Sequence, residues 1–104
     1  MKTNDNNVSE MRTYTVIPEP FSGSRERAVV LTSMLPEDLS NAHVIIDATD
    51  RKAYAQGFVD ELCKQVAEKR QAATVTIVSN DKILRQRAEN SAQLRNFSNR
   101  LFFC

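Results

Sequence analysis

The sequence lacks the features that mark membrane, secreted and zinc-binding proteins. No apolar run approaches the roughly 20 residues that a membrane-spanning helix needs. The segment before Arg12 is polar and has no apolar core of a signal peptide, so we expect a cytoplasmic protein that does not bind membranes. The two cysteines, Cys63 and Cys104, have only His43 to join them, which does not make a zinc pattern. We therefore expect no metal site and no cofactor.

The chain also lacks an excess of charge of either sign. Its formal net charge is +1 with 26% charged residues, so nothing in the overall charge favours nucleic acid as a partner. The length of 104 residues predicts one domain with a modest core. Residues 1–10 are dominated by Asn, Asp and Ser and predict a flexible tail, which leaves residues 11–104 as a single α/β domain.

Three segments predict strands. Residues 11–17 alternate polar and apolar side chains until Pro18, which favours a short edge strand. Val44-Ile45-Ile46 is β-branched throughout, as in a strand covered on both faces. Residues 74–78 resemble it with more polar alternation. We expect a small mixed sheet of about four strands with helices packed against it, and a parallel strand–helix–strand crossover between residues 43 and 78.

Three helices are expected around these strands. The first begins after the cap Ser24 and ends near Met34, with an inward stripe of Ala28, Leu31, Met34 and Leu35. The second begins near Gly57 with one apolar side and one polar side; the apolar side is Phe58, Val59, Leu62, Cys63 and Val66, and the polar side is Asp60, Glu61, Lys64, Gln65, Glu68 and Lys69. The third follows the cap region Ser79–Asp81 and runs on, long or broken at Asn90-Ser91, to Phe102.

The segment between His43 and Val66 is the most informative part of the chain. A buried strand ends at Asp47, a polar loop follows, and Gly57 opens an amphipathic helix. In α/β proteins such a loop lies at the end of the sheet where binding sites are usually found. The segment has no nucleophile and no phosphate-binding loop, so it indicates docking rather than chemistry. We expect a protein partner to contact Asp50, Arg51, Lys52, Tyr54, Gln56, Gly57, Asp60 and Glu61.

An alternative is a small enzyme or anion- or nucleotide-binding protein. Asp47 and Asp50 follow the central strand, where carboxylates can hold magnesium, although aspartates in turns more often bind loop amides. Ser22, Ser24, Arg25 and Arg27 surround a helix start that could hold an anion, although a simple cap with two solvated arginines is the favoured interpretation. His43 lies at the opposite end of the strand from Asp47, and Cys63 faces the core, where thiols are unreactive.

The last third of the chain offers a further surface. Its basic residues are Lys82, Arg85, Arg87, Arg95 and Arg100. They could contact phosphates, but a solvated face or a docking surface for an acidic partner fits the small excess of charge better. Phe102 and Phe103 either pack on the domain or form a contact surface, so a homo-oligomer through the C-terminal helix is a further alternative.

Two motifs resemble a known family. Gly57-Phe58-Val59-Asp60-Glu61-Leu62, after a strand that ends in Asp47, is similar to the helix start of STAS-like domains, the relatives of bacterial anti-sigma-factor antagonists. Residues 23–28, Gly-Ser-Arg-Glu-Arg-Ala, resemble the Gly-x-Arg-x-x-Ala helix start of the same family. The resemblance covers residues 21–79 with thinly spread matches.

The resemblance implies a bacterial regulatory protein without enzymatic activity. STAS-like antagonists bind a GHKL-type ATPase or anti-sigma kinase, and many are phosphorylated on a serine at the start of the second helix. In this sequence Gln56 and Gly57 stand at that place, and neither accepts a phosphoryl group. This departure from the family pattern implies either partner binding without the usual phosphorylation switch or a different role altogether.

Overall fold

The computed structural model describes residues 11–18, 24–49 and 54–104. The expected tail, together with Ser22, Asp50, Arg51 and Lys52, lies outside these residues. The described chain alternates strands and helices, in the order β1 (Arg12–Val16), α1 (Arg25–Thr32), β2 (Ala42–Asp47), α2 (Gln56–Cys63), η2 (Lys64–Lys69), β3 (Thr74–Val78), α3 (Lys82–Arg95), η3 (Ser98–Arg100) and β4 (Leu101–Phe103).

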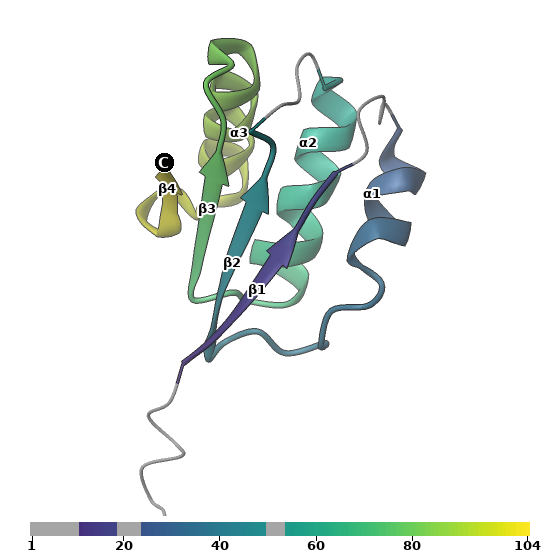
Figure 1. Ribbon diagram of the computed structural model, residues 1–104, viewed down its shortest axis with the longest axis vertical. Helices are drawn as coiled ribbons and strands as arrows, with labels where there is room; N and C mark the ends of the chain where they lie inside the picture. Colours follow the sequence, from purple (N-terminus) through teal and green to yellow (C-terminus); the bar gives the residue numbers. More distant parts are fainter. Residues whose placement is uncertain (1–10, 19–23, 50–53) are drawn as a thin grey trace, which may run out of the picture.

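The four strands form one sheet in the order β1-β2-β3-β4, and each neighbouring pair is parallel. The α/β class with about four strands is thus confirmed, but the sheet is parallel throughout rather than mixed. Parallel neighbours joined by right-handed crossovers place every connecting helix on the same side of the sheet. Figure 1 shows this arrangement, with α1, α2 and α3 behind the strands and α2 between the other two helices.

Alternation along the strands separates the core from the open face. In β2, Val44 and Ile46 are buried and their register partners in β3 are Val75 and Ile77, which are also buried. Ile45 lies between Val44 and Ile46, is only partly buried, and points to the side opposite the helices. The expectation that this strand is covered on both faces is therefore wrong for the described residues, since no described helix covers the second face (Figure 1).

The first helix confirms its predicted cap but not its whole stripe. The Ser24 hydroxyl accepts a hydrogen bond from the Arg27 amide at 3.1 Å, which satisfies one of the unpaired amides of the first turn. Ala28 is fully buried, and Leu31 and Leu35 pack against the core. Met34 is 92% exposed, because α1 ends at Thr32 and the following turn directs this side chain outward.

The second helix has the predicted apolar side, with Phe58, Val59, Leu62, Cys63 and Val66 all buried. It continues beyond Cys63 as the π-helical segment η2. The predicted polar side is wrong in part: Asp60, Glu61 and Gln65 are buried too, because α1 and α3 flank α2 and close over it. The third helix is continuous through Asn90-Ser91, with the predicted cap Asp81 at its start.

The end of the chain folds differently from the prediction. Asn96 adopts a left-handed conformation with φ of 62°, which ends α3. A short 3₁₀ turn then leads into β4, so Leu101, Phe102 and Phe103 form an edge strand rather than a helical stripe. Leu101 and Phe103 pack on the core, whereas Phe102 points the other way and is 51% exposed. Packing on the domain is therefore confirmed for Phe103, whereas a contact surface at the exposed Phe102 stays a prediction.

Candidate partner-docking surface

Asp60 is the centre of an ionic network that joins the three helices. Its Oδ1 accepts hydrogen bonds from the Ser91 hydroxyl at 2.7 Å and from Arg95 Nε at 2.9 Å. Its Oδ2 accepts from Arg95 Nη2 at 2.6 Å and from Arg25 Nη1 at 2.9 Å. The paired contact with Arg95 is a two-pronged guanidinium–carboxylate bond, the strong form of this interaction. One buried carboxylate of α2 therefore holds α1 and α3 in fixed positions.

The network extends along α2 to Glu61 and Gln65. Arg25 Nη1 reaches Glu61 Oε1 at 3.4 Å, and Gln65 Nε2 donates to Glu61 Oε2 at 2.7 Å. Arg70 Nη1 donates to Gln65 Oε1 at 3.0 Å. Each buried carboxylate of this helix thus has an arginine partner and a neutral donor, the Ser91 hydroxyl for Asp60 and the Gln65 amide for Glu61, as a buried charge requires.

The electrostatics follow from these contacts. Hydrogen bonds from Arg95, then Ser91 and Arg25, hold the pKa of the Asp60 carboxyl well below its usual range against the opposing effect of burial. Burial alone would raise the pKa of Glu61, but the Gln65 hydrogen bond and the charges of Lys64 and Arg25 lower it overall. Both carboxylates are therefore ionised at neutral pH, and the network is balanced by its arginines.

A surface depression of about 330 Å³ opens beside this network, on the helical side of the molecule. Its walls come from all three helices and consist of Arg25, Gln56, Asp60, Asn90, Ser91 and Leu94. Leu94 is 73% exposed and is the apolar residue of the lining. Sequence reasoning missed Asn90, Ser91 and Leu94 as site residues, and it assigned Arg95 to a basic surface rather than to a partner of Asp60. Ser91 and Arg95 stand four residues apart and Ser91 adjoins the apolar Ala92, a spacing that could have indicated a shared helix face.

Tyr54 holds the start of α2 in place through contacts on the inner side of the helix. Its ring is buried, stacks on Phe58 with 5.2 Å between ring centroids, and its hydroxyl donates to the Pro18 carbonyl at 3.5 Å. Arg87 donates to the Tyr54 carbonyl, and Gln56 Nε2 donates to the Arg87 carbonyl at 3.2 Å. The loop before α2 is thereby tied to α3.

These positions revise the predicted contact set. Tyr54, Asp60 and Glu61 are buried, so their side chains are not available as the exposed contacts that the sequence suggested. Gln56 is exposed and Gly57 partly so, and both remain at the surface beside Arg25. Asp50, Arg51 and Lys52 lie outside the described residues. Of the predicted contact surface, which comprised the loop at residues 50–57 and the exposed side of α2, the described part that remains accessible is Gln56 and Gly57, and Gln56 lines a depression that the three helices share.

Ser22 and Asp50 of the anion-binding alternative lie outside the described residues, and the structure gives Ser24, Arg25 and Asp47 partners within the fold. Ser24 caps α1, and Arg25 points to Asp60 and Glu61. Asp47 Oδ1 accepts from the Thr49 amide at 3.1 Å and the Thr49 hydroxyl at 2.6 Å, the turn arrangement that the simpler interpretation predicted. Within the described ranges, no group of three His, Cys, Asp or Glu residues could hold a metal ion.

Other candidate side chains have structural partners. His43 Nδ1 lies 2.6 Å from the Thr74 hydroxyl on the neighbouring strand. Burial raises the pKa of the Cys63 thiol to about 12, as expected for a core cysteine. Arg100 donates to the carbonyls of Ala72 and Ala67, and Arg85 lies over the Phe103 ring, 4.8 Å from its centroid. Arg95 belongs to the ionic network around Asp60. Most residues of the predicted basic surface therefore make contacts within the fold.

No protein-family model, curated protein or solved structure matches this chain. No helix in the described part of the chain is both long and apolar enough to cross a membrane.

Proposed function

We propose that the chain is a non-enzymatic, STAS-like regulatory module of bacterial type that docks a partner protein on the outer surface of its helical layer. The observation that carries the proposal is the depression between α1, α2 and α3, whose walls are held by the Asp60 network. Rigid, preformed surfaces bind with less loss of conformational entropy than surfaces that must order first.

Leu94 supplies the apolar anchor of the proposed surface. It is 73% exposed and lies at the wall of the depression, next to polar groups that can orient a partner, such as Gln56 and Asn90. Contact surfaces commonly combine a central apolar residue with a polar rim. The motif around Gly57 adds the resemblance to antagonists that bind a GHKL-type ATPase or anti-sigma kinase, which makes such a protein the first partner to test.

The proposed module acts without a phosphorylated serine at the start of α2. Gln56 and Gly57 occupy that place, and a Cβ atom at Gly57 would lie 3.7 Å from the Arg25 side chain, an ordinary contact. Space therefore does not exclude a side chain at this position. A Gly57→Asp variant would bring a negative charge beside Arg25, which lines the depression, and we expect it to weaken docking as a phosphate would.

The test measures binding of the purified chain to a GHKL-type ATPase encoded beside its gene. Leu94→Asp should weaken binding at least about tenfold, as expected when a central contact residue is lost. Ile83→Asp is the matched control, because Ile83 lies on the same helix, is 57% exposed and does not line the depression. Equal binding by the wild-type chain and both variants would refute the proposed surface.

A further inference from the structure

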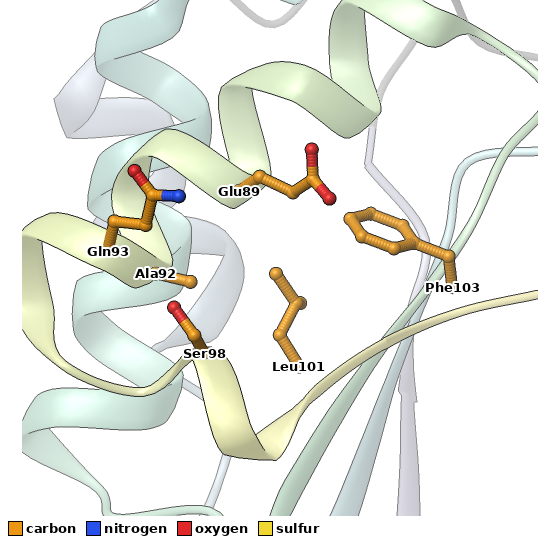
Figure 2. Close-up of a pocket in the computed structure, with 6 residues that line it drawn as sticks. All are labelled: Glu89, Ala92, Gln93, Ser98, Leu101 and Phe103. Atoms are coloured by element: carbon orange, nitrogen blue, oxygen red, sulfur yellow. The ribbon is translucent and has the colours of Figure 1, made fainter.

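The edge of β4 and the adjacent α3 form a second site, separate from the proposed docking surface. A pocket of about 200 Å³ lies between them and is lined by Glu89, Ala92, Gln93, Ser98, Leu101 and Phe103. Figure 2 shows Leu101 and Phe103 reaching from the strand toward the helix, with Glu89 and Gln93 above them and Ser98 at the near side. The pocket therefore has an apolar base and a polar rim.

The backbone of β4 is open beside this pocket. The strand pairs with β3 on one side, and the described residues add no strand on its other side. The Cys104 amide donates to the Ile77 carbonyl, so Cys104 and Phe102 direct their backbone groups toward β3. Leu101 and Phe103 alternate with them, and the Leu101 amide already donates to the Ser98 carbonyl. The Phe103 amide and the carbonyls of Leu101 and Phe103 therefore face the open edge.

The pocket and the open edge lie on the same strand, so one extended segment can use both. A peptide strand laid against β4 would pair with the free backbone groups of Phe103 and Leu101. Its alternate side chains would point to the α3 side, the same side as Leu101 and Phe103. One of these side chains would enter the pocket, and the next on that side would lie two residues away along the peptide.

The charge of Glu89, at the rim of the pocket, indicates a second contact for a bound peptide. Glu89 is exposed and forms no ion pair with the described residues, while Arg85 on the same helix is engaged with the Phe103 ring. A basic side chain on the peptide, two residues from the apolar one, would therefore meet Glu89. Arg85 lying over Phe103 keeps that ring in place as the wall of the pocket.

We infer that the edge of β4 binds an extended peptide of a partner protein by strand addition, with an apolar side chain in the α3–β4 pocket and a basic side chain near Glu89. This site lies on a different edge of the fold from the depression around Asp60. Its existence does not depend on the identity of the partner at the helical surface.

The probe is a linear random-peptide library displayed on phage and selected against the immobilised full chain. Enriched peptides should carry Lys or Arg two residues from an apolar residue. They should lose binding to Gln93→Trp, which covers the rim of the pocket, and keep binding to Gln86→Trp, an exposed position of the same helix outside the pocket. Failure to enrich any peptide, or enrichment of peptides that bind both variants equally, would overturn the inference.

A synthetic copy of the most enriched peptide then tests strand pairing. A single N-methyl group at each amide in turn should weaken binding about five- to tenfold at every second position, where the amide faces β4, and leave the others nearly unchanged. Glu89→Gln should weaken binding up to about fivefold and reduce its dependence on salt. Equal effects of N-methylation at all positions would show that the peptide does not bind as a strand.

Discussion

At the scale of single residues, Asp60 is the polar group that links all three helices. Its carboxylate accepts four hydrogen bonds, from Ser91, from Arg25 and twice from Arg95. Removing one partner of a buried ion pair lowers the stability of the fold, because the remaining charge loses its counter-charge and is too buried for water to replace it fully. The position of α1 and α3 on α2 therefore depends on a residue that the hydrophobic pattern assigned to solvent.

Replacing this carboxylate tests its contribution to stability. Asp60→Asn keeps the shape but removes the charge, and we expect a loss of about 2–4 kcal/mol in the free energy of unfolding, since Arg95 retains some access to solvent. Glu68→Gln is the control, because Glu68 bonds to the same arginine but its side chain is 46% exposed, so the loss should stay below about 1 kcal/mol. Urea denaturation measures the free energy of unfolding of both variants. Equal losses would contradict the view that Asp60 is the residue on which the network depends.

The buried carboxylates of Asp60 and Glu61 make the stability of the fold depend on pH. The folded-state pKa values of Asp60 and Glu61 lie below their unfolded values, so the unfolded chain binds protons first as the pH falls. Stability from these groups is full above the unfolded pKa values, near pH 4, and is lost progressively below them. Thermal melting from pH 7 to pH 2 should show a steep decline for the wild type and a shallower one for Asp60→Asn. Parallel curves would be inconsistent with this linkage.

The two cysteines should differ in reactivity. Cys63 is fully buried and its thiol pKa is raised to about 12, whereas Cys104 is exposed. A thiol reagent should therefore modify one cysteine rapidly in the native chain and both after denaturation. Mass spectrometry identifies the modified residue. Rapid native labelling of Cys63 would show that the core around α2 opens more readily than its packing indicates.

At the scale of elements, the end of α3 decides whether β4 forms. Asn96 takes the left-handed conformation that closes the helix and turns the chain back toward the sheet. Asn96→Val should cost about 1–2 kcal/mol of stability, because a β-branched side chain is strained there. Asn96→Gly should be nearly neutral, since glycine adopts this conformation freely. Denaturation of the two variants provides the comparison, and equal destabilisation would argue against strain as the cause.

Local patterns predicted most of the elements before β4. The cap at Ser24, the apolar side of α2 and the cap at Asp81 depend on neighbours within one or two turns, and all three are confirmed. β4 could not be predicted in this way. Its three residues have no alternation long enough to distinguish a strand from a helical stripe, and pairing with β3 depends on the left-handed turn at Asn96.

The residues of the candidate site were harder to predict, because their burial also depends on contacts between segments far apart in the sequence. Hydrophobic periodicity separates apolar from polar residues but does not reveal which polar residues are covered by a neighbouring helix. Asp60, Glu61 and Gln65 fall on the polar side of this helix and are buried because α1 and α3 cover it, and Arg25 and Arg95 from those helices pair with Asp60. The partner Arg95 is 35 residues away in sequence, so only the packed structure brings the pair together.

At the scale of the whole molecule, the fold presents two different faces. The helices share one side of the sheet, and their outer surface bears the depression around Asp60 and Leu94. The other face of the sheet carries His43, Ile45, Thr74 and Thr76, uncovered by any described helix. Parallel sheets are usually covered on both faces, so this second face competes with the helical surface as the place where a partner binds.

Hydrogen–deuterium exchange of the chain with and without its partner distinguishes the two faces most directly. We expect the partner to slow exchange in the first turn of α2 and around Asn90–Leu94 of α3, where the depression lies, and to leave the amides of β1 and β2 unchanged. Slowed exchange confined to the strands, with none at Gln56 or Leu94, would contradict the claim that the helical layer is the docking surface.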